Sequence, residues 1–184
     1  MRFDPHHTAS AALVVRAALG DPASLDRLLR EIQQPLYDHI AFIMGDGDAA
    51  SDVLQDVLLI VCRSLISLQD PLLFRAWVFR IATRAALTEV RRAGRGAPIP
   101  LDAALDLPAD LADEPAFDAG LIAALPALVA ELPPACGVVV RLRYLEELSI
   151  AEVAEALTLP LGTVKSRAAY GVGLLRQRLA AVPR

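Results

Sequence analysis

Apolar side chains recur every three or four residues along most of the chain, which is the period of an amphipathic helix. A clear case is the segment from Ala49 to Ser67, with apolar Val53, Leu54, Val57, Leu58, Ile60, Val61 and Leu65. No segment of the sequence shows the strict apolar-polar alternation of a half-buried strand. The pattern therefore predicts an all-α fold.

Helix boundaries follow from capping residues. Asp21-Pro22 and Asp70-Pro71 each place a side-chain cap before a proline at the first helical position. Pro35 is expected to open a further helix that ends near Gly45, and residues 46–48 are expected to form a turn. The pattern predicts helices over 8–19, 22–33, 35–45, 49–67, 71–92, 117–132 and 133–145.

An acidic, proline-rich stretch interrupts this series. Residues 94–116 contain Pro98, Pro100, Pro108 and Pro115 together with Asp102, Asp106, Asp110, Asp113 and Glu114. Such a composition buries too little apolar surface to order itself. We therefore expect two small helical domains, 1–95 and 117–184, joined by a flexible acidic linker over 96–116.

The C-terminal domain contains a candidate helix-turn-helix. Ser149 and Glu152 have the spacing of a capping box at the start of a short helix. Residues 158–162 interrupt that helix, and Thr163 is expected to start a second one with Lys165, Ser166 and Arg167 in its first turn. The first turn of such a second helix reaches base edges and phosphates in a major groove. An αα-hairpin that closes a helical bundle has a similar pattern.

The amino-acid composition limits the classes of protein to which the chain can belong. The chain has 184 residues, 55% of them hydrophobic, and a net charge of −4. No apolar run approaches the ~20 residues of a membrane span, and no signal peptide is visible, so a cytoplasmic location is expected. Cys62 and Cys136 are expected to be small buried hydrophobes. The three histidines form no metal-ligand cluster, so neither metal nor cofactor is expected.

Charge is unevenly distributed along the chain. Residues 98–131 hold seven acids and no base, whereas residues 132–184 hold seven bases and four acids. Within the first domain, the segment 38–56 has five aspartates and no base, and the segment 75–95 has six arginines against one glutamate. The first domain thus has an acidic segment followed by a basic one, and the second domain is basic overall.

Three segments together resemble the extracytoplasmic-function (ECF) sigma factors of the bacterial sigma-70 family. LRYLEELSIAEVAEAL followed by GTVKSR is similar to sigma region 4, DAASDVLQDVLLIVCR to region 2.2, and FRAWVFRIATRAALTEVRR to regions 2.3 and 2.4. The resemblance implies a non-enzymatic subunit that binds the β′ and β subunits of core RNA polymerase and reads promoter DNA. It also implies control by an anti-sigma factor.

The resemblance assigns roles to particular residues. It places polymerase binding on Asp52, Gln55 and Asp56, whose spacing of three and four residues puts them on one helix face; a solvated surface has the same pattern. It places contacts to the −10 element on Arg80, Arg84, Arg91 and Arg92. It places contacts to the −35 element on Arg143, Thr163, Lys165, Ser166, Arg167 and Tyr170. Within the helix-turn-helix itself, Arg167 has a second possible role, in an ion pair with Glu152 or Glu155.

Trp77 has two interpretations. It is a candidate platform for base stacking, but an apolar face that also contains Phe74, Val78 and Ile81 favours a core position.

The chain also departs from the family pattern. Thr83-Arg84 replaces the usual Arg-Asn, Thr88 replaces a frequent Asp, and AAYGVG follows GTVKSR where two further arginines are common. Thr158 takes the place of the usual turn glycine, which predicts a residue at positive φ. The thin basic content after Arg167 leaves open a sigma-like interaction protein, or a stand-alone helix-turn-helix regulator, without productive promoter reading.

Overall fold

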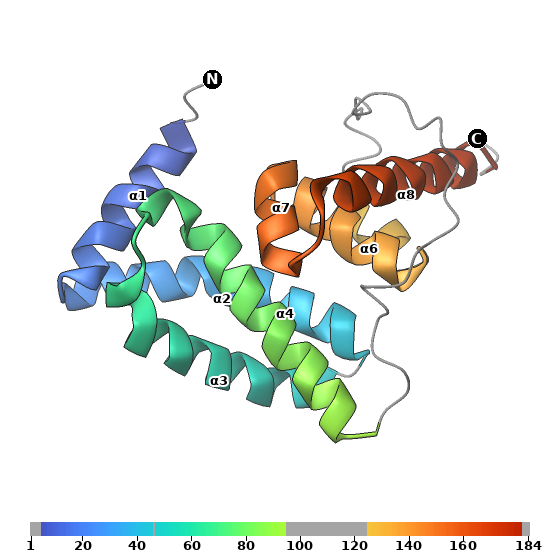
Figure 1. The fold of residues 1–184 in the computed structure, drawn as a ribbon. Coiled ribbons are helices and arrows are strands. Elements are labelled where there is room, and N and C mark those ends of the chain that lie inside the picture. The colour runs from blue at the N-terminus through green and yellow to red at the C-terminus, as the bar shows by residue number, and fades with distance from the viewer. Residues whose placement is uncertain (1–4, 46, 95–124, 182–184) are drawn as a thin grey trace. The chain divides into compact units, whose positions relative to one another are not determined.

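The computed structural model describes residues 5–45, 47–94 and 125–181 (Figure 1). Contacts divide the chain into two compact units, Met1–Arg95 and Gly96–Arg184. The predicted linker, 96–116, lies outside the described residues. Each unit is described separately below. Every element of the described part is a helix, as the sequence pattern predicts.

The first unit is a bundle of four helices, α1 (Pro5–Ala18), α2 (Pro22–Met44), α3 (Gly47–Ser64) and α4 (Phe74–Arg92). Two single 3₁₀ turns, η1 (Leu65–Ser67) and η2 (Pro71–Leu73), connect α3 to α4. Helix α2 packs against α1, α3 and α4, and α3 also packs against α4. The core of the bundle therefore forms around α2. None of the helices in the described part of the chain is both long and apolar enough to cross a membrane.

Helix α2 differs from the prediction, because Pro35 lies inside a continuous helix and does not start a new one. A proline inside a helix removes one backbone hydrogen bond at a cost of about 3 kcal/mol. The apolar face nevertheless runs through Pro35, with Leu28, Ile32, Leu36 and Ile40 all buried. Packing of this face against three neighbouring helices outweighs the local cost.

A buried polar contact joins α2 to α4. His39 Nε2 lies 2.8 Å from the hydroxyl oxygen of Thr83, and that hydroxyl donates to the carbonyl of Phe79 at 2.7 Å. The His39 ring also meets the Phe79 ring edge to face, with centroids 5.2 Å apart. Thr83, one of the departures from the family pattern, is therefore a core residue that bonds a histidine on the neighbouring helix.

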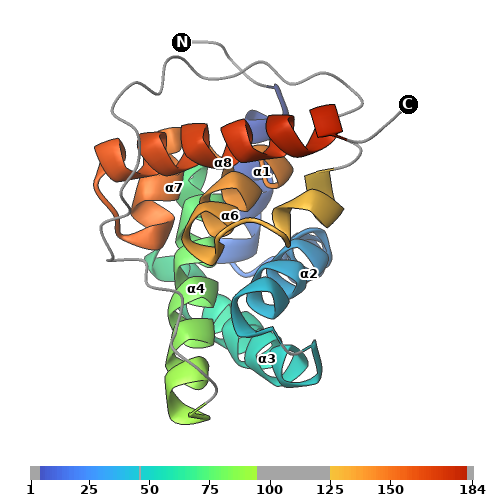
Figure 2. The ribbon, with the colours of Figure 1, turned by 90° about the vertical axis from the view of Figure 1, so that its right-hand side faces the viewer.

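The second unit contains a helical segment at 125–129, α6 (Pro134–Val140), one π-helical turn η3 (Arg141–Leu145), α7 (Ile150–Leu157) and α8 (Leu161–Ala181). Most of the helix predicted over 117–132 lies outside the described residues. The helix predicted over 133–145 ends in the π turn. Long helix α8 runs beside α6 and packs on α7 (Figure 2).

The close approach of α6 and α8 depends on Gly171. A Cβ atom added there would lie 2.6 Å from Cγ2 of Val140 and 3.5 Å from Cβ of Cys136. By contrast, a Cβ at Gly173, two residues on, would meet no atom within 4 Å. Packing therefore explains the first of these mid-helix glycines and not the second.

Candidate nucleic-acid and polymerase interfaces

Helix α3 presents an acidic face to solvent. Asp52, Gln55 and Asp56 are all exposed, while Val53, Leu54 and Val57 on the opposite side are buried. The spacing of the three polar residues thus places them on one surface, as the sequence predicts. The face carries two carboxylates and one amide, a chemistry that suits a basic partner.

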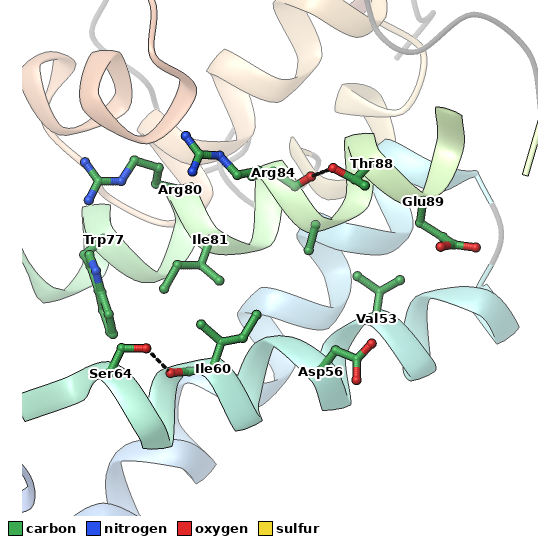
Figure 3. Close-up of a pocket in the computed structure, with 11 residues that line it drawn as sticks. Val53, Asp56, Ile60, Ser64, Trp77, Arg80, Ile81, Arg84, Thr88 and Glu89 are labelled. Carbon is green, nitrogen blue, oxygen red and sulfur yellow. Dashed lines mark hydrogen bonds between the residues drawn. The ribbon is translucent and has the colours of Figure 1, made fainter. Parts of the chain in front are cut away.

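Between α3 and α4 lies a groove with a volume of about 570 Å³ (Figure 3). Its apolar part comes from both helices, and Ile60 and Ile81 point toward one another across it. Its lining residues are Val53, Asp56, Ile60, Ser64, Trp77, Arg80, Ile81, Arg84, Ala85, Thr88 and Glu89. Asp56 of the acidic face and Arg80 and Arg84 of the basic helix therefore line one groove.

The four arginines predicted to contact the −10 element are all accessible. Arg80 is half-buried, and Arg84, Arg91 and Arg92 are exposed. Arg92 Nε lies 3.1 Å from a carboxylate oxygen of Glu89, and Arg91 Nε donates to the carbonyl of Leu87 at 3.1 Å. Both contacts are on the surface, where such interactions contribute little energy, so these side chains remain available to phosphates.

Trp77 is not a core residue, although the apolar face around it favours that position. It is half-buried and lines the groove, whereas Phe74 and Val78 are buried as predicted. The Trp77 and Phe74 rings are 6.2 Å apart and tilted by 40°. Because the Trp77 ring lines the groove, it is within reach of a ligand there.

The helix-turn-helix has well-defined local geometry. The Ser149 hydroxyl accepts from Glu152 N at 3.2 Å, and the Glu152 carboxylate accepts from Ser149 N at 2.8 Å, which confirms the capping box. Thr158 has φ of 56°, as predicted. Thr158 N donates to Glu155 O, and Leu159 N donates to Ala154 O, the two bonds of a Schellman motif.

Helix α8 begins at Leu161, two residues before the predicted start at Thr163. Val164 N donates to Pro160 O at 3.1 Å, the first backbone bond of this helix. The N–H groups at the start of α8 are therefore those of Leu161, Gly162 and Thr163. Lys165, Ser166 and Arg167 lie in the second turn and not in the first.

Arg167 does not reach the surface, which corrects its predicted role as a DNA contact. Its side chain is 1% exposed. Burial raises the pKa of the Cys136 thiol, and the positive charge of Arg167 partly opposes that shift. Arg167 therefore points inward beside α6, where it cannot touch a base edge or a phosphate. Its predicted pairing with Glu152 or Glu155 stays a prediction.

The other residues predicted for the −35 element differ in accessibility. Lys165 is exposed, and Thr163, Ser166 and Tyr170 are half-buried. The Ser166 hydroxyl donates to Thr163 O at 3.1 Å. Arg143, also half-buried, donates to Leu148 O at 3.3 Å and lies over the Tyr144 ring at 5.2 Å. Lys165 is thus the most accessible of the predicted cations on this unit.

The sequence pattern missed two features of the second unit. Arg141 and Glu146 form a buried ion pair at 3.3 Å that spans the π turn, and no spacing rule indicates it. Leu161, which the sequence pattern assigns to the turn between the two helices, is instead the first residue of α8 and is 52% exposed. The predicted burial of both cysteines is also wrong for Cys62, which is exposed on α3. Within the described ranges, no three His, Cys, Asp or Glu side chains are placed to hold a metal ion.

Comparison with known proteins matches both units to family models. Residues 28–96 match Sigma-70 region 2, and residues 122–171 match Sigma-70, region 4. The ECF RNA polymerase sigma factor SigM of Mycobacterium tuberculosis is 30% identical over 175 residues, which cover 95% of this chain and 85% of SigM. The corresponding SigE of Mycolicibacterium smegmatis is 35% identical over 89% of this chain, and the chain spans 65% of the length of SigE.

A solved structure has a similar fold. The sigma factor RpoE from Bartonella quintana, in complex with the anti-sigma factor NepR, superposes with a TM-score of 0.61 at 18% identity. The match covers 86% of this chain and 98% of the RpoE chain.

Proposed function

The chain belongs to the ECF sigma factors of the sigma-70 family, and we propose that it directs core RNA polymerase to specific promoters by contacting their −10 and −35 elements. One observation carries the proposal beyond family membership. On adjacent helices of the first unit, the acidic face of α3 borders a groove lined by Trp77, Arg80 and Arg84. The proposal therefore assigns a basic protein to the acidic face and single-stranded DNA to the groove beside it.

The chemistry of the groove suits an unstacked base. An aromatic ring stacks on any base, a contact worth about 1–3 kcal/mol, and arginines along the same strip neutralise the phosphates on either side. Helix α4 supplies both groups: Trp77 points into the groove, and Arg80 and Arg84 extend from the side of α4 away from Ile81 (Figure 3). We assign Arg80, Arg84, Arg91 and Arg92 to the −10 element on this basis.

In the second unit, we assign Lys165 and the start of α8 to the −35 element. The N–H groups of residues 161–163 offer a phosphate the positive end of the helix dipole. Thr163, Ser166 and Tyr170 flank this site, and Arg143 anchors the loop before α7. Arg167 is excluded from the assignment by its burial.

Control by an anti-sigma factor is part of the proposal. The structurally similar RpoE is held by the anti-sigma factor NepR. We extend that mode of control to this chain. Because a sigma factor acts on polymerase and chromosomal DNA, the proposal carries the expectation of a cytoplasmic location.

Run-off transcription tests the proposed function. The purified chain is added to bacterial core polymerase on a library with randomised −10 and −35 elements, and transcripts are sequenced. We expect transcripts from a subset that shares both elements. Binding to core polymerase without any transcript would favour the sigma-like interaction protein. The net charge of −4 opposes DNA binding by the free chain, so a sigma factor of this charge should bind promoter DNA poorly without polymerase. Tight, specific gel shifts by the free chain at ~100 mM salt would therefore favour the stand-alone regulator.

Polymerase docking is tested on the acidic face. The double variant Asp52→Arg, Asp56→Arg places cations against a basic partner surface, where like charges cost several kcal/mol. Capture of core polymerase is expected to fall at least tenfold, with thermal stability unchanged. The control is Asp26→Arg, Glu31→Arg on the exposed side of α2, which makes the same change in net charge. Equal capture by both double variants would remove the assignment of the α3 face.

A further inference from the structure

The exposed line at the start of α8 combines apolar and cationic chemistry. Leu161 and Lys165 are four residues apart and therefore lie one turn from each other on the same face. Leu161 is 52% exposed, Lys165 is exposed, and Ala169 continues the line one turn further on. Val164 and Ala168, three and seven residues after Leu161, are buried, so the exposed line is bounded closely on that side of the helix. Leu161, the first residue of α8, is thus exposed to solvent and does not belong to the core.

The turn before α8 holds Leu161 in a defined position. The Schellman bonds of Thr158 and Leu159 close the turn, and the Leu159 side chain is buried beneath it. Pro160, which has a fixed φ, leads directly into Leu161. An exposed leucine on such a rigid turn loses little conformational entropy when it binds, so its apolar surface is well suited to recognition.

The major groove contains one apolar group that a leucine can recognise, the C5 methyl of thymine. The first residues of a recognition helix are those that reach base edges. Arg167 is buried and therefore cannot make such a contact. Gly162, beside Leu161, has open space at its Cβ position, so the backbone can approach the DNA closely.

We propose that Leu161 is a specificity-determining residue that packs on the methyl group of a thymine in the −35 element, one helical turn from the contact made by Lys165. This inference rests on the proposed function and adds the base that the second unit prefers. The chemistry predicts that the preferred −35 element contains a thymine whose methyl group, and not only its pairing, contributes to recognition.

Replacing thymine by deoxyuridine tests the proposal, since it removes only the methyl group. Holoenzyme formed with the wild-type chain is assayed for transcription initiation on promoters carrying one such replacement at each −35 thymine, on either strand. We expect about a fourfold loss at one position, the value of one buried methyl-sized group. Absence of any position sensitive to deoxyuridine would overturn the proposal.

The variant Leu161→Ala provides the second part of the test, which asks whether the response to deoxyuridine depends on this side chain. It is expected to initiate equally well on thymine and deoxyuridine at the sensitive position, with unchanged thermal stability, because the side chain is exposed. The control Leu19→Ala removes a leucine that is 82% exposed on α1, and it should retain the wild-type fourfold response. A full response to deoxyuridine in Leu161→Ala would overturn the assignment. Failure of the wild-type holoenzyme on every promoter would instead contradict the proposed function itself, and this inference with it.

Discussion

Helices α4 and α8 are the two candidate DNA-binding helices, and they place their arginines differently. Arg84, Arg91 and Arg92 of α4 are exposed, whereas Arg167 of α8 is 1% exposed. The sequence shows basic residues in both helices at positions that suit DNA. The comparison shows that the number of cations in a segment does not give the number that a phosphate can reach.

Packing explains the difference. Helix α4 buries one stripe, which includes Phe74, Val78 and Ala82, against its neighbours in the bundle. Its arginines fall outside that stripe. Helix α8 contacts both α6 and α7, so two sides of it are covered near its start. Position 167 falls on a covered side, and the exposed line begins instead with Leu161 and Lys165.

The largest effect is expected from removing the buried arginine. Arg167→Ala deletes a large buried side chain, which costs about 3 kcal/mol of folding free energy in the second unit. Hydrogen exchange of residues 134–181 during urea unfolding measures the loss. The fluorescence of Trp77, the single tryptophan, reports on the first unit and should not change. The control Arg84→Ala should leave both units as stable as wild type. Equal stability of Arg167→Ala and wild type would contradict the structural role.

The next largest effects are expected at two glycines of α8, one on the side covered by α6 and one with open space around it. Gly171→Ala places a methyl group against Val140, and overpacking of this kind costs about 1–3 kcal/mol. Gly173→Ala fills open space and improves helix propensity, which should stabilise the second unit by about 0.5–1 kcal/mol. Urea denaturation of both variants provides the measurement. Stabilisation by both substitutions would show that α6 and α8 are not in close contact at Gly171.

A smaller change in stability is expected from substitutions in the turn between α7 and α8. Thr158 has φ of 56°, a conformation that costs a residue with a Cβ atom about 1 kcal/mol. Thr158→Gly should therefore raise the stability of the second unit by about 0.5 kcal/mol, after allowance for the greater freedom of glycine in the unfolded chain. Ala151→Gly, at an exposed helical position of α7, is the control and should lower stability by about 1 kcal/mol. Destabilisation by Thr158→Gly would show that the turn is not left-handed in solution.

Local signals in the sequence predicted much of this structure. The Asp21 and Asp70 caps, the Ser149–Glu152 capping box and the positive φ of Thr158 follow from interactions between residues close in the chain. The periodicity likewise placed Asp52, Gln55 and Asp56 together on one surface.

The failures have a different origin, because each depends on contacts between distant segments. Pro35 stays helical through packing of α2 on three neighbours, and Trp77 lies in the groove between α3 and α4 and not in the core. Arg167 is buried because α6 covers that side of α8. Periodicity shows which residues share a helix face, but only the fold shows which face is covered.

The most direct test of this account compares Lys165→Ala and Arg167→Ala in one transcription assay. Each holoenzyme is tested on promoters altered at single −35 positions. Lys165→Ala should lose discrimination at one position, or weaken all promoters alike if it holds a phosphate, and should remain as stable as wild type. Arg167→Ala should lower output from all promoters by a common factor, in parallel with its loss of stability. Loss of discrimination at a single −35 position by Arg167→Ala, with wild-type stability, would place that arginine in the DNA groove and contradict the account.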